Sequence, residues 1–428
     1  MQRIIKRSLK NIVRKSPVLQ KIVKQQLQNV VRSNNPWSLF PRYLPPSSLD
    51  YLQKAITSGF TVDLVTQFED KFAKMIGTRY AVAVSNCTAA IHTALACSGL
   101  EPGDEVIVSP IADYGDIQGL LTEFLVPVFP DVDVVTGNIT AQDIERVLTP
   151  RSRAVLLVHF YGLAADIRPI EELCRRHNLL LIEDCCQSLL ACDGDTKTGS
   201  FGAMGCFSLD REKHLSTDGG GVIVTDDAHL AEKCRRFAHN RGCEYQEGYG
   251  RIHSWLGYNY RYSMLQAAVG LAHLETFEPR MARRMSLARR LAEQLNDVKG
   301  IILPGVRQKD GHAYWLFHFM IDPACFSVAV DELVHALAAR GIPCSTAPYY
   351  LVPESHTLLH RSPSLVKKEV VRGWEYAAAR YHYSSEMCPN AKTHLARTIR
   401  WLWSEHLNEA DVDKMGQVIK ETLVKYQR

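Results

Sequence analysis

No stretch of this sequence approaches the roughly 20 uncharged apolar residues that a helix needs to span a bilayer. The start of the chain also lacks the compact apolar run and the small-residue cleavage site of a secretory signal. We therefore expect a cytoplasmic protein. Its 428 residues, 46% hydrophobic and 22% charged, have ordinary globular statistics, with room for roughly two to three domains.

The twelve cysteines are scattered along the chain and lack the paired spacing that is typical of metal ligands. Cys185 and Cys186 are adjacent and cannot form an ordinary disulfide with each other. Reduced, mostly buried thiols are the expectation, and no metal is assigned. Internal repeats and low-complexity tracts are also lacking.

Acidic residues are absent from residues 1–49, although this segment holds ten Lys or Arg residues. The remainder carries 40 basic against 46 acidic residues. In this basic N-terminal arm, Ser16-Pro17 is typical of a helix cap followed by a first-turn proline. Apolar residues recur at helical spacing on both sides of it: Ile5, Leu9, Ile12, Val13, then Leu19, Val23, Leu27 and Val30. The pattern predicts two short amphipathic helices.

The basic N-terminal arm has several open roles. Residues 1–35 could lie peripherally on an anionic membrane surface, at the inner face of a membrane. They could equally pack on a partner subunit or fray, since basic amphipathic helices have several uses. The scarcity of serine argues against a cleaved transit peptide. Nucleic-acid binding is not expected, because no aromatic residue lies among the helical repeats and no nucleic-acid-binding fold is recognised.

Helical patterns alternate with short β-branched runs between about residues 60 and 290. The runs are residues 80–84, 105–109, 126–129, 154–159, 179–183 and 221–225. Strands separated by helices predict an α/β fold with a mostly parallel sheet buried on both faces. Cofactor sites in such sheets form at the carboxyl ends of strands. Thr88 and Asp184 follow or end predicted strands, and Lys213 precedes the last one.

A long helical pattern follows from Leu265 to Leu295 and leads into a second region. There, residues 312–321 predict a strand, and residues 330–340 and 408–426 predict helices. We expect three parts: the basic arm at residues 1–49, a large cofactor-binding domain at 50–290, and a smaller C-terminal α/β domain at 291–428.

The lysine loop, residues 206–221, contains Lys213 eight residues before Gly221 and follows the predicted strand that ends near Asp184. A pyridoxal-phosphate enzyme needs a lysine that bonds covalently to the cofactor aldehyde. It also needs a carboxylate that keeps the pyridine nitrogen protonated, so that the ring can take up electrons. Lys213 and Asp184 are placed to supply these two groups.

Five further segments accompany the lysine loop in a fixed order. They are residues 85–90, 102–108, 158–162, 183–188 and 257–261. With these landmarks the chain resembles the DegT/DnrJ/EryC1/StrS family of fold-type I pyridoxal-phosphate enzymes, which are typically sugar and aminocyclitol aminotransferases. The resemblance extends over roughly residues 50–425, and six ordered landmarks are far more specific than any one of them.

The resemblance implies a role for each matching residue. Thr88, with the neighbouring Ala89, and Ser208 match the positions that bind the cofactor phosphate. Asp184 matches the carboxylate of the pyridine nitrogen, and Gln187 matches the side chain that reaches the ring hydroxyl. The remaining two matches, Asn259 and Arg261, belong to a segment that crosses to the neighbouring subunit's phosphate, which implies a homodimer with shared active sites.

The sequence departs from the family pattern at three places. Cys87 replaces the usual glycine before Thr88. Asp113, with Tyr114 beside it, aligns where an aromatic residue usually stacks on the cofactor ring. After the lysine, the acidic residue of the glycine cluster is shifted by one position, to Asp218.

The family also includes sugar dehydratases in which histidine replaces the lysine; here position 213 is lysine. A lysine can relay a proton between the donor and the cofactor, so we expect an aminotransferase. The expected donor is glutamate or glutamine, and the expected acceptor is a keto sugar, nucleotide-linked, or a keto cyclitol. The alternatives are the dehydratase reaction and a non-catalytic cofactor-binding regulator, which the altered stacking segment would favour.

Overall fold

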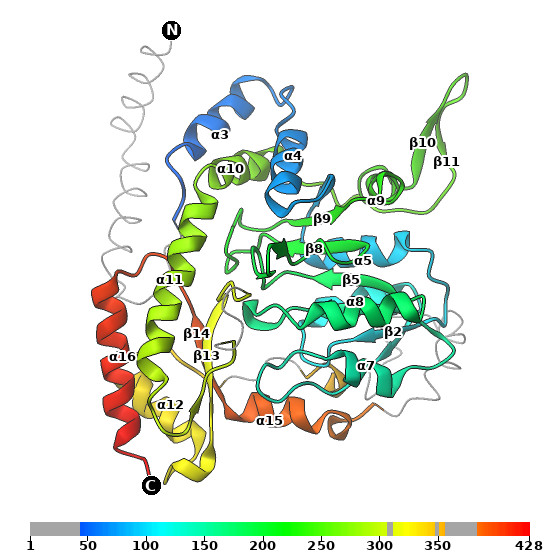
Figure 1. Ribbon diagram of the computed structural model, residues 1–428. Coiled ribbons are helices and arrows are strands. Elements are labelled where there is room, and N and C mark those ends of the chain that lie inside the picture. The colour runs from blue at the N-terminus through cyan, green and yellow to red at the C-terminus, as the bar shows by residue number, and fades with distance from the viewer. Residues whose placement is uncertain (1–42, 306–310, 347–350, 356–382) are drawn as a thin grey trace, which may run out of the picture.

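The computed structural model describes residues 43–305, 311–346, 351–355 and 383–428 (Figure 1). The helices of the basic N-terminal arm, predicted within residues 1–35, fall outside these ranges. Within the described ranges, no helix combines the length and the apolar character that a membrane crossing requires.

A seven-stranded sheet forms the centre of the molecule, in the order β1-β9-β8-β5-β4-β2-β3. Its strands are β1 (Tyr80–Val84), β2 (Glu105–Val108), β3 (Val126–Val128), β4 (Ser152–Val158), β5 (Leu180–Asp184), β8 (Met204–Ser208) and β9 (Gly221–Thr225). Strand β9 is antiparallel to both of its neighbours, and the other pairs are parallel. The predicted α/β fold with a mostly parallel sheet is confirmed.

Strand β8 is the one strand of this sheet that the sequence analysis does not predict. It assigns residues 206–208 to the lysine loop, but in the structure they complete β8. Gly205 interrupts the apolar pattern there, and glycine inside a strand weakens the strand signal. Its presence has a steric reason, because a Cβ at Gly205 would lie 2.4 Å from the backbone of Gly199.

The two faces of the sheet bury different residues of the same strands. Along β1, Val82 and Val84 belong to one hydrophobic core, whereas Ala81 and Ala83 belong to the other. This alternation follows from the two-residue period of a strand. Helices cover both faces: α3 (Ser48–Thr57), α4 (Leu64–Ile76), α5 (Cys87–Cys97), α6 (Tyr114–Thr122), α7 (Ala141–Val147), α8 (Ile167–Arg176), α9 (Ala228–Asn240) and α10 (Met264–Leu274).

Helix α11 (Phe277–Leu295) connects the large sheet to a smaller unit. Its first half contributes Phe277 and Met281 to the core beside α4 and α10, and its second half contributes Leu287 and Leu291 to a third core. That third core also contains an antiparallel sheet and two helices: β12 (Ile301–Ile302), β13 (Leu316–Ile321), β14 (Thr398–Leu402), α12 (Val330–Ala339) and α16 (Glu409–Val424). The predicted strand at 312–321 begins only at Leu316.

Helix α15 (Pro389–Arg397) lies under the large sheet in Figure 1 and joins its core. Ala391 and the preceding Cys388 are buried in the same core as β2 and β4. Nearby, the hydroxyl of Tyr383 donates to the carbonyl oxygen of Pro127 at 2.8 Å. This part of the C-terminal region therefore packs on the large sheet.

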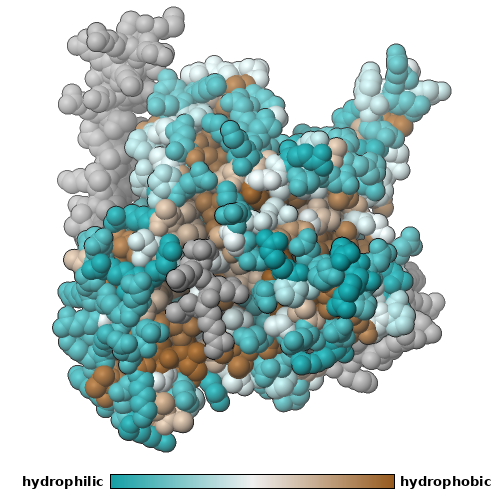
Figure 2. All heavy atoms as spheres, viewed as in Figure 1, coloured by the Kyte–Doolittle hydropathy of each residue, from teal (hydrophilic) through white to brown (hydrophobic). Residues whose placement is uncertain are grey.

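Two small hairpins complete the part of the chain that the structure describes. One joins β6 (Cys192–Asp193) to β7 (Thr196–Lys197). The other joins β10 (Cys243–Gln246) to β11 (Gly250–His253) and projects from the body of the molecule, as Figures 1 and 2 show. Tyr245 and Tyr249 in this second hairpin are 80% and 79% exposed.

Candidate active site

The turn between β1 and α5 carries the predicted phosphate-binding residues. Asn86 caps α5, and its side-chain oxygen accepts a hydrogen bond from the backbone N–H of Ala89 at 2.8 Å. Thr88 lies in the first helical turn, where backbone amides and the helix dipole favour an anion. Cys87 is the first residue of the helix and has an ordinary backbone conformation, so its Cβ costs the turn nothing.

The end of the lysine loop packs directly on this turn. Gly220 forms a bridge with Asn86, and a Cβ at Gly221 would lie 2.3 Å from the carbonyl oxygen of Asn86. Gly220 also has φ +120°, a conformation that side chains rarely adopt. The glycine cluster thus permits close packing, which fixes the lysine loop beside Thr88.

Lys213 and Ser208 lie on either side of a tight turn after β8. Ser208 ends the strand and is 8% exposed, and its hydroxyl accepts from the backbone N–H of Asp210 at 3.3 Å. The backbone N–H of Lys213 donates to the carbonyl oxygen of Asp210 at 3.0 Å. Lys213 is half-buried, and its Nζ lies 4.0 Å from the ring centroid of Trp315.

Asp184 ends β5 and is 1% exposed. Its two carboxylate oxygens accept from the backbone N–H of Cys186 at 2.9 Å and from the thiol of Cys186 at 3.2 Å. Burial raises the pKa of Asp184, while the bonds from Cys186 and the charge of Lys213 oppose that rise. A buried carboxylate with a lysine nearby is the arrangement that a protonated pyridine ring requires.

Asp116 is a second buried carboxyl group in the same place, and the sequence analysis missed it. It lies in the first turn of α6, is 2% exposed, and is close enough to Asp184 to be acted on by its charge. Burial and the charge of Asp184 raise the pKa of Asp116 well above its ordinary value. Burial and the neighbouring charge thus favour the neutral form of Asp116.

Gln187 is completely buried behind Asp184. Its amide oxygen accepts from the backbone N–H of Tyr161 at 2.8 Å. This bond orients the side chain so that the amide nitrogen is the end that would donate to the ring oxygen of the cofactor. Tyr161 has φ 54°, so the segment that orients Gln187 is held in an uncommon conformation.

Asp113 and Tyr114 begin α6. The exposed side chain of Asp113 caps the helix and accepts from the backbone N–H of Gly115 at 2.9 Å. A Cβ at Gly115 would lie 2.6 Å from the hydroxyl oxygen of Thr88, so this helix start adjoins the phosphate turn. Tyr114 is half-buried and packs against the large core.

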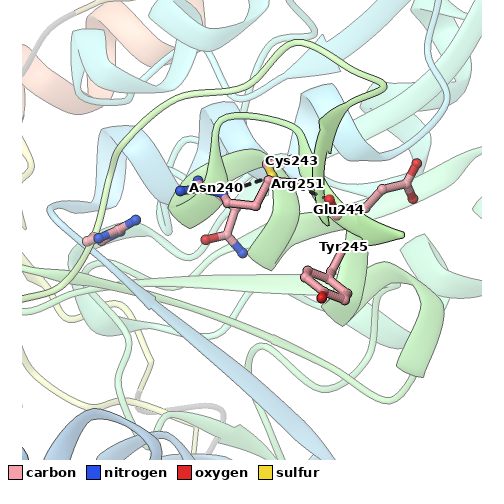
Figure 3. A pocket seen from close by; sticks show the side chains of 6 residues that line it. Asn240, Cys243, Glu244, Tyr245 and Arg251 are labelled. Atoms are coloured by element: carbon pink, nitrogen blue, oxygen red, sulfur yellow. Dashed lines mark hydrogen bonds between the residues drawn. The ribbon is translucent and has the colours of Figure 1, made fainter. Parts of the chain in front are cut away.

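Asn259 and Arg261 belong to the segment between the projecting hairpin and α10. Both are exposed, although Arg261 forms a backbone bridge with Val84 at the end of β1. Its Nε donates to the carbonyl oxygen of His239 at 2.9 Å. Arg261 also lines a pocket of about 260 Å³ at the base of the projecting hairpin (Figure 3), together with Asn240, Cys243, Glu244, Tyr245 and Arg251.

The one group in the described ranges with the geometry of a metal site is His159, Glu183 and Cys185. The side-chain atoms of His159 and Glu183 are already engaged in hydrogen bonds. His159 donates from Nε2 to Glu183 at 3.0 Å and accepts at Nδ1 from the backbone N–H of Ala165. Glu183 also accepts three backbone N–H bonds. The group therefore serves to brace the loop after β5.

The structure brings Thr88, Asp184, Gln187, Ser208 and Lys213 together at the carboxyl ends of the sheet strands. An anion-binding helix start, a buried carboxylate and a lysine fit pyridoxal 5′-phosphate, because they match its phosphate, ring nitrogen and aldehyde. The fold and this site define the class of fold-type I pyridoxal-phosphate enzymes.

Comparison with known proteins agrees with that class. The model of the DegT/DnrJ/EryC1/StrS aminotransferase family matches residues 47–420. The Bacillus subtilis spore coat polysaccharide biosynthesis protein SpsC is 30% identical, over 83% of this chain and 89% of its own length. A Caulobacter vibrioides GDP-perosamine synthase is 34% identical, over 65% of this chain and 74% of its own length.

Among solved structures, an aminotransferase from Psychrobacter cryohalolentis superposes with a TM-score of 0.79. It is 25% identical and covers 91% of this chain and all of its own. The chain belongs to the DegT/DnrJ/EryC1/StrS aminotransferase family. It is a pyridoxal-phosphate-dependent aminotransferase.

Proposed function

We propose that this enzyme transfers an amino group from glutamate or glutamine to the keto group of a nucleotide-linked sugar. The observation that carries the proposal is the position of Lys213, beside Asp184 and the phosphate turn. The GDP-perosamine synthase among its relatives supports a nucleotide-linked sugar as acceptor, with a keto cyclitol as the alternative.

Each site residue has a task in this proposal. The bound cofactor supplies an electron sink for the carbanion formed during amino transfer. Asp184 stabilises the protonated ring nitrogen, and Gln187 donates a hydrogen bond to the ring oxygen. Thr88, the amide of Ala89, and Ser208 bind the phosphate. Asp113 and Tyr114 remain candidates for covering the ring.

Lys213 is the catalytic residue. It would hold the cofactor covalently and, once released, its amine could take up and give back a proton at the α-carbon of the donor. A side chain that can do both favours amino transfer over the dehydratase reaction. Asp113 stands where the family usually has an aromatic residue, and its role as helix cap explains why an aspartate is present there. This departure therefore does not require that the protein has lost catalysis.

The active enzyme is, in this proposal, a homodimer with shared sites. Asn259 and Arg261 are exposed, and Arg261 lines a pocket at the projecting hairpin, which suits residues that complete a partner's phosphate site. The hairpin next to them exposes Tyr245, Tyr249 and, just after it, Leu256, which is 85% exposed. Exposed apolar side chains on a projecting element are typical of a subunit interface.

The basic N-terminal arm adds a second proposal, for residues 1–35. Ten cationic and no acidic residues among the first 49 support contact with an anionic membrane surface.

The half-reaction tests the function directly. Incubation with L-glutamate should convert the bound cofactor to its amine form and release 2-oxoglutarate, and glutamine is the next donor to examine. If every amino donor fails, while a keto sugar yields a deoxygenated product, the enzyme is a dehydratase. A crystal soaked with amino sugars would then identify the acceptor and the aminated carbon.

A further inference from the structure

Trp315 lies against the side chain of Lys213. The centroid of its ring is 4.0 Å from Nζ of Lys213, and Trp315 is only 5% exposed. An ammonium group over an indole face is attracted by the negative charge of the ring face, and the attraction grows as the site loses water. The indole therefore holds the charged amine at a defined place.

The position of Trp315 does not depend on the Lys213 side chain. Its Nε1 donates to the carbonyl oxygen of Glu212 at 3.0 Å, so the ring is fixed to the backbone of the lysine loop. Its own carbonyl oxygen accepts from Nη2 of Arg284 at 3.2 Å and from the backbone N–H of Trp403 at 3.3 Å. Trp315 is thus anchored at both ends, on the lysine loop and on the smaller unit.

We propose that Trp315 is the resting place of the Lys213 amine whenever that amine is not bonded to the cofactor. The proposal rests on the catalytic role assigned to Lys213 above. An amino donor that took the place of Nζ on the bound cofactor would release the Lys213 amine, and the proton of the donor ammonium would pass to it. Lys213 would then be a free ammonium on a flexible chain, which must stay close to the cofactor in order to bond to it again.

Trp315 therefore stabilises the state in which Lys213 is released. Replacing it should shift the glutamate half-reaction toward the state in which Lys213 is bonded. In Trp315→Leu, which loses a desolvated cation–π contact, the equilibrium constant of the glutamate half-reaction should change about tenfold. The change should be smaller in Trp315→Phe, which keeps an aromatic face. Trp403→Phe is the matched control, since Trp403 is a buried indole whose Nε1 donates to the carbonyl oxygen of Arg284.

The contact itself is measured on the full chain without cofactor. The unfolding equilibrium constants of the wild type, Lys213→Met, Trp315→Leu and the double variant form a double-mutant cycle. We expect a coupling of about tenfold between the two positions, and none between Lys213 and Trp403. If Trp315→Leu does not fold, the same cycle with Trp315→Phe should still show a reduced coupling.

Two results would overturn the proposal. One is an effect of Lys213→Met that is the same with and without the Trp315 indole, because Trp315 would then be packing alone. The other is a half-reaction equilibrium unchanged in both Trp315 variants. Borohydride fixation of the cofactor separates these failures from a failure of the proposed function: a label on another lysine would refute the role of Lys213 itself, even if the coupling were present.

Discussion

The side chains of Asp116 and Asp184 are both buried, neither more than 2% exposed, and the charge of Asp184 helps to raise the pKa of Asp116. Two interacting carboxyl groups that are both buried resist being charged at the same time. Because burial and charge favour the neutral form of Asp116, Asp184 is the member of the pair that suits the cofactor ring as a carboxylate. Asp116, in the first turn of α6, therefore helps Asp184 to supply the negative charge that the ring nitrogen of the cofactor requires.

Replacing Asp116 should change how stability depends on pH. The pKa of Asp116 is higher in the folded protein than in the unfolded chain. At pH values between these two pKa values the folded protein binds one more proton, so its stability falls as pH rises. In Asp116→Asn this loss, up to about 1.4 kcal/mol per pH unit, should disappear. Urea unfolding of the cofactor-free protein from pH 5 to 8 measures it. Parallel curves for the two proteins would mean that Asp116 ionises normally.

The fold could be predicted in large part from the sequence, because it follows from local patterns. β-branched runs located six strands of the large sheet, and β8 was missed because Gly205 serves a contact with Gly199 that no local pattern records. Thr88, Asp184 and Lys213 were found through motifs at strand ends, where α/β sheets place their sites.

Two site residues could not be found in this way. Asp116 occupies the first turn of a helix, where acidic residues are ordinarily solvated partners of the helix dipole. Trp315 reaches Lys213 from the second region of the chain, and its contact exists only after the two units have packed together. A sequence pattern within one segment reveals neither the burial of Asp116 nor the contact of Trp315 with Lys213.

A second stability prediction concerns Glu405, which binds two arginines in the smaller unit. Its carboxylate accepts from Arg284 at 2.7 Å and from Arg280 at 3.2 Å, and it is 7% exposed. Glu405→Gln should cost about 3–5 kcal/mol of unfolding free energy, because buried guanidinium charge loses its partner. Urea denaturation measures the cost. The exposed pair of Arg340 and Glu421 provides the control, and Glu421→Gln should change stability little.

Acid should remove the contribution of Glu405. Burial alone would raise its pKa, but the charges of Arg284 and Arg280 overcome burial and lower the pKa to about 2. A lowered folded-state pKa gives stability that is complete above the unfolded value, about 4.3, and is lost as pH falls toward 2. The stability of Glu405→Gln should decline less over this range. An equal decline in both proteins would contradict the assignment.

Mixed dimers test whether active sites are shared between subunits. Lys213→Ala and Arg261→Ala chains should each be inactive alone, because one lacks the catalytic amine and the other lacks a phosphate contact. A dimer of one chain of each kind should regain activity, since one of its two sites inherits both intact residues. Absence of rescue in verified mixed dimers would show that Arg261 acts within its own chain or only as a surface charge.

Vesicle binding tests the basic N-terminal arm. The full chain should sediment with anionic vesicles but not with neutral ones, and binding should weaken as salt rises, since charges are screened within about 10 Å at 0.1 M. Removal of residues 1–35 should abolish binding and leave turnover of a soluble substrate unchanged. If the truncated protein instead loses its dimer or its cofactor, the arm is part of the assembly.

The most direct test of the account is the identity of the lysine that bonds to the cofactor. The purified protein should absorb visible light, and borohydride should bleach that band and leave the cofactor on the single peptide that contains Lys213. Lys213→Ala should abolish the label. Lys233→Ala, which changes a lysine on helix α9, should retain it. A reducible adduct that persists on another lysine in Lys213→Ala would contradict the central claim.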